Sequence, residues 1–252
     1  MPRLRWLPCW LLAEAFFSSA IDLLTPLSTG TSSSSTWRPT GVSTALPDSN
    51  STILPSSTLS MRACVLAAGG FESNRDWLRE AWGQNARGEW PSDNFLIRGT
   101  RFNQGVLLRH LLDEHGADGI GDPTQAHMVA IDARAPLYDG GICTRIDCVS
   151  LGVVVNREAR RFYDEGEDFW PKRYAIWGRL VAQQPGQIGY SIIDSQAIGR
   201  FMPPVFPGVK ADTLPDLAQK LGLPVDRFMR TLTDYNTACR VGTFDHTTLD
   251  DC

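Results

Sequence analysis

Hydrophobic side chains recur at intervals of three and four residues in five stretches, which is the pattern of amphipathic helices. The sequence predicts these helices at 73–83, 107–116, 170–184, 213–222 and 225–235. Ser73 and Thr213 are each followed three residues later by an aspartate, so both are expected to cap a helix N-terminus. Gly83, Gly116 and Gly222 are expected to end helices, because glycine readily adopts the left-handed backbone found there.

Three short apolar runs, at 63–67, 150–156 and 187–194, predict buried strands. The predicted strands and helices do not alternate regularly, as they would in a doubly wound parallel sheet. No internal repeat is present either. The expected fold class is therefore α+β.

The first 60 residues have a different pattern from the rest of the chain. Residues 1–24 begin with arginines and continue into a short apolar run interrupted by Glu14, which imitates a secretory signal. Residues 28–60 are rich in Ser, Thr and Pro and hold too few apolar side chains to offset the entropy of ordering, so we expect them to be irregular or disordered. Residues 1–60 are either a signal with a flexible linker or an out-of-frame translation. We favour the second interpretation and expect a cytoplasmic protein.

The amino-acid composition limits the functional classes to which this protein could belong. The 252-residue chain is 42% hydrophobic and 21% charged, as is usual for a globular protein long enough to bury a core. Its net charge of −4 argues against nucleic-acid binding, which usually requires a basic domain. The N-terminal apolar run is too short to span a membrane as a helix. The six cysteines and four histidines form no C-x-x-C or H-E-x-x-H motif, so no metal site is expected.

An arginine-rich stretch is the main candidate for binding chemistry. Six arginines fall within 35 residues: Arg145, Arg157, Arg160, Arg161, Arg173 and Arg179. They form either a solvated face or a site for an anionic ligand, because the planar guanidinium matches a carboxylate. His127 precedes them and, taken alone, is more often a structural residue. Together, cationic clamps and a positioned acid/base are what a dehydrogenase of a carboxylic acid requires, with hydride leaving to a cofactor.

Gly69 and Gly70 follow the predicted strand at 63–67. Glycine carries no Cβ, so such a pair lets the backbone approach a ligand closely. A plain turn is nevertheless the better interpretation of this pair alone. The sequence contains no G-x-G-x-x-G, P-loop or G-x-S-x-G motif, and therefore no nucleotide-binding fingerprint of its own.

Several segments of residues 62–252 resemble the flavoprotein subunits of the fumarate reductase/succinate dehydrogenase family. These segments are 65–71 (VLAAGGF) with Asn74, 152–156 (GVVVN) with 161–165 (RFYDE), and 213–222 (TLPDLAQKLG) with Tyr235 and Asn236. The segments 77–83 (WLREAWG) and 167–173 (EDFWPKR) are similar to the tricarballylate dehydrogenase branch of that family. One departure is Ala68, where the family usually has threonine.

The resemblance implies a fold, a cofactor and an activity. Residues 61–120 would be a fragment of the FAD-binding domain with the start of the cap, and residues 121–252 would be the substrate-capping domain. The implied activity is FAD-dependent dehydrogenation of a tricarboxylic acid such as tricarballylate, with hydride passing from a substrate C–H bond to the flavin. The implied partners are a small polycarboxylate substrate and a separate electron-acceptor protein.

The resemblance also implies roles for individual residues. Gln125 and His127 match a segment whose histidine binds a substrate carboxylate, and Thr144 matches a carboxylate-binding threonine. Arg145 stands where fumarate reductases carry a proton-delivering glutamate, which favours a dehydrogenase or the binding of an extra carboxylate. Arg173 resembles the family's active-site arginine, so Arg173 and His127 are the expected catalytic residues. The expected cofactor contact is formed by Ala68, Gly69 and Gly70.

Two parts of the family pattern are missing from the sequence. They are the N-terminal dinucleotide-binding unit with its glycine fingerprint, and a C-terminal segment that supplies further substrate-binding residues. We therefore expect an incomplete, inactive chain that binds FAD weakly or not at all. The alternatives are a non-catalytic fragment or pseudogene product, a small secreted protein, and a fumarate-type reductase of another dicarboxylate.

Overall fold

The computed structural model describes residues 9–13, 15–20, 67–139, 144–146, 148–167, 170–243 and 245–250. For 9–13, 15–20 and 170–175 it describes the backbone alone. All the described helices and strands belong to one compact unit, made of Met1–Leu23 and Gly69–Cys252.

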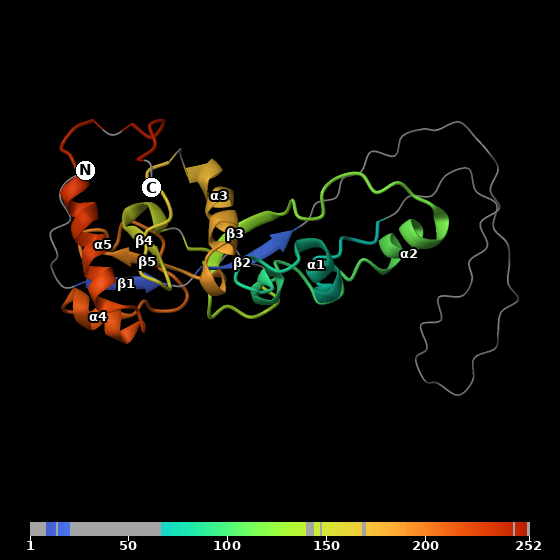
Figure 1. Cartoon of the computed structure of the whole chain (residues 1–252), viewed down its shortest axis with the longest axis horizontal. Coiled ribbons are helices and arrows are strands. Elements are labelled where there is room, and N and C mark those ends of the chain that lie inside the picture. Colours follow the sequence, from blue (N-terminus) through green and yellow to red (C-terminus); the bar gives the residue numbers. More distant parts are fainter. Residues whose placement is uncertain are drawn as a thin grey trace, which may run out of the picture. The chain divides into compact units, whose positions relative to one another are not determined.

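The described ranges contain five α-helices, and each lies where the sequence predicts one (Figure 1). They are α1 (Arg75–Trp82), α2 (Val106–His115), α3 (Trp170–Ala182), α4 (Leu214–Lys220) and α5 (Val225–Ala238). Short 3-10 turns lie at Pro91–Asn94, Val149–Leu151 and Pro185–Gln187. None of the described helices combines the length and the apolar character needed to cross a membrane.

The N-cap of α1 is Asn74, not the predicted Ser73. The Asn74 side chain accepts a hydrogen bond from the N–H of Trp77 (3.1 Å). Ser73 Oγ instead donates to the carbonyl oxygen of Thr100 (2.6 Å), a residue distant in sequence. Both side chains suit an N-cap, and this tertiary hydrogen bond decides between them. Thr213 caps α4 as predicted, since its hydroxyl accepts from the backbone N–H three residues later (3.3 Å).

The strands form two antiparallel sheets. A four-stranded sheet has the order β4-β5-β1-β6, with strands Val153–Asn156, Gly189–Ile193, Cys9–Ala13 and Lys210–Ala211. A two-stranded sheet pairs β2 (Ala15–Ala20) with β3 (His127–Asp132). The strands expected at 150–156 and 187–194 are confirmed as β4 and β5. Of the strand expected at 63–67, only residue 67 is described, and it lies outside any strand.

Strand β3 is an element that the sequence analysis missed. Five of its six residues are buried, all except His127. A strand buried on both faces reads as a continuous apolar run instead of an alternating one, and the run Met128–Val129–Ala130–Ile131 has that form. The signal was therefore present, but it spans only four residues.

The N-terminal stretch departs from the irregular structure expected for residues 1–60. Its backbone forms β1, which pairs with β5 and β6, and β2, which pairs with β3 along all six of its residues. The apolar run that imitates a secretory signal also fits a strand, because apolar side chains suit a half-buried sheet. The other residues of 1–60 lie outside the described part of the chain.

Two hydrophobic clusters lie on opposite sides of β4. Val153 and Val155 belong to a cluster that includes Phe228 of α5, while Val154 belongs to a cluster that includes Trp177 of α3. This alternation follows from the two-residue repeat of a strand. The cluster around Trp177 also contains Phe71. The boundary expected at residue 120 therefore does not divide the molecule into two cores, and the assignment of 61–120 and 121–252 to separate family domains stays a prediction.

Helix α3 lies directly on β3 at Gly178. A Cβ atom added there would come within 2.1 Å of the Met128 carbonyl oxygen and 2.7 Å of the Met128 Cβ. Real Cβ contacts of this length do not occur, so only glycine permits the observed approach of helix to strand. Figure 1 shows α3 running beside β3.

Gly178→Ala is expected to lower the free energy of unfolding by about 2 kcal/mol or more. Alanine favours a helix by about 1 kcal/mol, but overpacking against a backbone carbonyl costs more than that gain. Urea denaturation followed by circular dichroism measures the change. Gly242→Ala is the matched control, because a Cβ there meets nothing within 4 Å. Equal stabilities of the two variants would show that α3 does not rest on β3 in this way.

Candidate functional site

Gln125, His127 and Arg179 form an exposed group at the start of β3, which we call the β3 rim. Gln125 and His127 are exposed and lie two residues apart. Arg179, on α3, donates a hydrogen bond from Nη1 to Oε1 of Gln125 (2.7 Å). Arg179 directly follows Gly178, where α3 approaches β3 closely. The structure thus joins the predicted site residue Gln125 to one arginine of the arginine-rich stretch, and His127 lies two residues from Gln125 along the chain.

The β3 rim also has an acidic neighbour. Asp122 accepts hydrogen bonds at Oδ1 from the Thr124 hydroxyl (2.7 Å) and the Thr124 N–H (2.8 Å). These bonds, with a smaller contribution from the positive charge of Arg179, hold the pKa of Asp122 below its usual value. Gln125 Nε2 donates to the second carboxylate oxygen (3.4 Å). Gln125 therefore lies between one guanidinium and one ionised carboxylate.

Thr144 and Arg145 lie near the other end of β3 from His127. The Asp132 N–H donates to the Thr144 carbonyl (2.9 Å), and Arg145 forms a β-bridge with Ile131. Ile131 is four residues along the strand from His127, a separation of about 13 Å at the usual rise per residue. The Thr144 side chain is buried and its hydroxyl donates to Asp139. The carboxylate-binding roles of Thr144 and Arg145 stay predictions, and the structure does not bring these residues to the β3 rim.

The side chain of Arg173 lies outside the described residues, and its backbone belongs to α3. Arg173 precedes Arg179 by six residues, which is about 9 Å along a helix axis. The expected catalytic role of Arg173 therefore stays a prediction. Arg179 is the arginine of α3 whose guanidinium has a described contact with the β3 rim.

The expected cofactor contact at Ala68, Gly69 and Gly70 lies in a loop before α1. Gly69 has a left-handed backbone (φ 72°), and a Cβ there would lie 2.9 Å from the Asn103 side-chain oxygen. Ala68 and Gly69 are exposed and Gly70 is half-buried. Small, exposed residues with free backbone suit the edge of a bound cofactor. Neither of the two cavities described next includes this loop.

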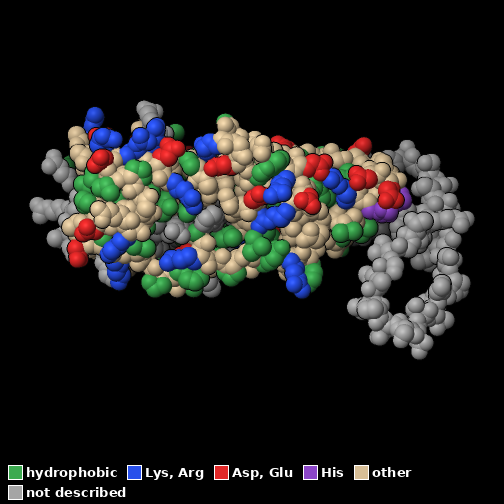
Figure 2. All heavy atoms as spheres, turned by 60° about the horizontal axis from the view of Figure 1, so that its bottom comes forward, with side chains coloured by type: hydrophobic (Ala, Val, Ile, Leu, Met, Phe, Trp, Pro, Cys, Tyr) green, Lys and Arg blue, Asp and Glu red, His purple; other side chains and the backbone are tan. Residues whose placement is uncertain are grey.

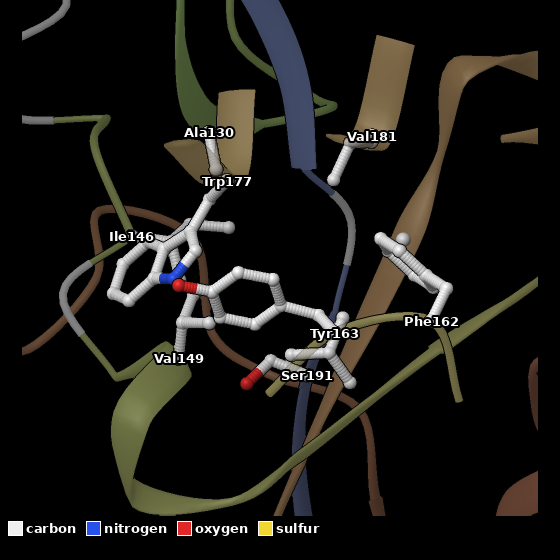
Figure 3. Close-up of a pocket in the computed structure, with 10 residues that line it drawn as sticks. Ala130, Ile146, Val149, Phe162, Tyr163, Trp177, Val181 and Ser191 are labelled. Atoms are coloured by element: carbon white, nitrogen blue, oxygen red, sulfur yellow. The ribbon is translucent and has the colours of Figure 1, made fainter. Parts of the chain in front are cut away.

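A small apolar cavity lies between β3, β4, β5 and α3 (Figure 3). Its volume is about 20 Å³, which is room for about one water molecule. The rings of Tyr163 and Trp177 meet edge to face beside it, with centroids 5.9 Å apart. The indole N–H of Trp177 is buried and has no hydrogen-bond partner among the described residues. Ligand pockets usually measure several hundred Å³, so this cavity does not hold a substrate.

A larger hollow of about 890 Å³ lies between α5, the 160–166 loop and residues 245–250. Its charged lining residues are Arg160, Arg161 and Arg200 against Asp164, Glu165, Asp194, Asp234, Asp245 and Asp250. Arg161 is already held by Glu165, by Asp250 (2.5 Å) and by the ring of Tyr235 (5.0 Å to its centroid). Because the carboxylates outnumber the arginines, this hollow is unsuited to a polyanionic ligand.

The family-like residues around β4 hold the strand in place. Glu165 accepts a hydrogen bond from the Val154 N–H (2.6 Å) and two from the Arg161 guanidinium to Oε2 (2.5 and 2.9 Å). Burial raises the pKa of the Glu165 carboxyl, and Arg161 and Val154 oppose that effect. Asn156 closes the turn after β4, since its side-chain oxygen accepts from the N–H groups two and four residues later (2.9 and 3.0 Å). These motif residues are structural in this chain.

Comparison with known proteins gives one informative relative. An alignment of 111 residues is 31% identical to a 3-oxosteroid 1-dehydrogenase of Mycolicibacterium smegmatis. The match covers 36% of this chain and 19% of that protein, so the chain spans about a fifth of the relative's length. No family model and no solved structure matches the chain. Part of the chain is therefore similar to an oxidoreductase.

Glu165→Gln is expected to lower the free energy of unfolding by about 2–3 kcal/mol. The amide can still accept from the Val154 N–H, but it removes the charge that pairs with Arg161, and hydrogen bonds to charged groups contribute about 1.5–3 kcal/mol. Denaturant unfolding measures the loss. Glu158→Gln removes the carboxylate of the exposed Arg160 pair and is expected to change stability by less than about 1 kcal/mol. A loss for Glu165→Gln no larger than for Glu158→Gln would contradict the structural role.

Proposed function

We propose that this chain is part of a flavin-dependent dehydrogenase. The observation that carries the proposal is the 31% identity over 111 residues to a dehydrogenase. The resemblance of 152–156 and 161–165 to a flavoprotein family supports the same proposal. In this proposal residues 121–252 cap the substrate, as the family resemblance implies.

We further propose a polycarboxylate such as tricarballylate as the substrate, bound at the β3 rim. Arg179 supplies a planar guanidinium that pairs with a carboxylate in two parallel hydrogen bonds. Gln125, whose oxygen accepts from Arg179 and whose amide nitrogen donates to Asp122, would keep that guanidinium oriented. His127 adds a second donor two residues away, on the first residue of β3. The hollow beside α5 has three arginines, but its six carboxylates would repel such a ligand.

A 3-oxosteroid is the second candidate substrate, because the relative's name specifies one. A steroid would need a largely apolar pocket of several hundred Å³. The apolar cavity beside Trp177 has about 20 Å³, and nine of the twenty residues that line the larger hollow are charged. The described residues therefore favour a polycarboxylate over a steroid. They suit a dicarboxylate equally well, so a dicarboxylate reductase is the alternative activity within the carboxylate class.

The loop at 68–70 fits one edge of a bound flavin, because its residues are small and largely exposed. When bound, FAD would accept the hydride that the substrate loses. The chain's own contribution would be to bind and orient the carboxylates through Arg179 and His127. Such orientation holds the reacting C–H bond in one position, which is a large part of catalysis in bimolecular reactions.

The 252-residue chain, purified from cells, is expected to contain far less than one FAD per chain. The physical reason is that its sequence has no glycine fingerprint to hold a dinucleotide, and the loop at 68–70 would provide a single contact. Absorption spectroscopy of the purified protein measures bound flavin, with a known flavoprotein purified in parallel as the control. A stoichiometric flavin spectrum would contradict this expectation and would show a cofactor site that the present residues do not reveal.

The chain is also expected to bind tricarballylate at the β3 rim. Arg179→Gln and His127→Gln are each expected to weaken binding about tenfold or more, since hydrogen bonds to a charged ligand contribute about 1.5–3 kcal/mol. Titration followed by NMR, with tricarballylate, succinate and a 3-oxosteroid as separate ligands, measures the affinities. Arg87→Gln is the matched control, because Arg87 is an exposed arginine that pairs with Glu89.

The outcomes test the proposed substrate class separately from the proposed dehydrogenase activity. Binding of the steroid but not of the carboxylates would overturn the substrate class and leave the dehydrogenase proposal intact. Equal loss in Arg87→Gln and Arg179→Gln would show that only overall charge matters, and the β3 rim would not be the site. If none of the three ligands binds, the alternative of a non-catalytic fragment would replace the proposal.

A further inference from the structure

The last turn of α2 brings two histidines together. The Nε2 atoms of His110 and His115 lie 3.2 Å apart, although the residues are separated by five positions. Their rings meet edge to face at 76°, with centroids 4.8 Å apart. The two imidazoles therefore do not stack; each directs the same nitrogen toward the other. Figure 2 shows histidine side chains at the surface with acidic groups around them.

Glu114 orients one member of this pair. Its Oε1 lies 3.2 Å from Nδ1 of His110, on the opposite side of the ring from Nε2. A carboxylate accepts a hydrogen bond from an imidazole N–H, which places the proton of neutral His110 on Nδ1 and leaves a lone pair on Nε2. Histidine ligands of metals commonly show this arrangement, with a carboxylate hydrogen-bonded to the nitrogen that does not bind the metal.

The distance between the two Nε2 atoms fits a shared metal ion. Zinc lies about 2.0–2.1 Å from histidine nitrogen, so two such ligands in a tetrahedral site are about 3.3 Å apart. The observed separation is 3.2 Å. With His110 in this tautomer, a proton on Nε2 of His115 would form a hydrogen bond across the same gap in the protein without metal. A bound cation would replace that proton with little movement of either ring.

The surroundings favour a positive charge. His115 is the last residue of α2, and the C-terminal end of a helix carries partial negative charge. Asp113 and Glu114 lie in the same turn. The positive charge of the nearby Arg109 is paired with the carboxylates of Glu80 (2.5 Å) and Asp113 (3.7 Å). Its guanidinium also lies over the ring of Trp77, 4.5 Å from the centroid.

We propose that His110 and His115 form a binding site for a divalent transition-metal ion, with Zn²⁺ as the probe that defines it. Imidazole suits Zn²⁺, Ni²⁺ and Cu²⁺, whereas Mg²⁺ requires oxygen ligands. The described residues contain no group of three or more His, Cys, Asp or Glu side chains around one metal position. The site therefore supplies two protein ligands and leaves the other coordination positions to water or to an external ligand.

The site is tested on the full 252-residue chain by isothermal titration with ZnCl₂, with MgCl₂ as the negative ion. His110→Gln and His115→Gln are each expected to weaken zinc binding about tenfold or more, and Glu114→Gln about tenfold through the loss of its orienting hydrogen bond. His246→Gln removes another exposed histidine and is expected to leave the affinity unchanged. Circular dichroism checks that α2 remains helical in each variant.

An NMR spectrum of the histidine rings gives a second readout. Zinc is expected to shift the Nε2 resonances of two histidines together, and both shifts should be absent in His110→Gln and in His115→Gln. No zinc binding by the wild-type chain would overturn the proposal. Unchanged affinity in a His110→Gln, His115→Gln double variant would overturn it too, because zinc would then be bound elsewhere, for example by cysteines.

Discussion

The contact of Gly178 with the Met128 backbone is the constraint on which the arrangement around β3 depends. It allows α3 to lie directly on the strand without an intervening side chain. The two neighbours of Gly178 then point to different surroundings: Trp177 joins the hydrophobic cluster and its small cavity, and Arg179 reaches Gln125 at the surface. One glycine thus positions both a part of the core and the candidate carboxylate site.

The segments that carry the family resemblance and the residues that could bind a ligand are different sets. Asn156, Arg161 and Glu165 are among the most recognisable residues of the family pattern, yet their side chains close a turn and anchor β4. They form a recognisable sequence pattern because the loss of a buried carboxylate or of its arginine partner destabilises the fold. Gln125 and His127 belong to only a weak sequence motif. Their polar side chains are nevertheless exposed, so a ligand could bind to them.

The predictions from sequence succeeded and failed for identifiable reasons. The five described helices were predicted because their apolar spacing is local and repeats over several turns. Strand β3 was missed because both its faces are buried, so it shows no alternation. Ser73 failed as a cap because a residue 27 positions away takes its hydroxyl. Thr144 and His127 are assigned to one site by the family resemblance, and that assignment stays a prediction; the structure adds that Thr144 pairs near the opposite end of β3 from His127, which sequence spacing does not reveal.

By itself, the sequence determined where the helices lie, which fold class to expect and which residue types could bind carboxylates. These properties depend on spacings of a few residues, where backbone geometry alone relates one side chain to the next. Only the tertiary structure decided that Arg179 is the arginine that meets Gln125, 54 positions away, and that His110 and His115 converge. Such pairings depend on helix packing and side-chain rotamers, which cannot be read from the spacing of residues along the chain.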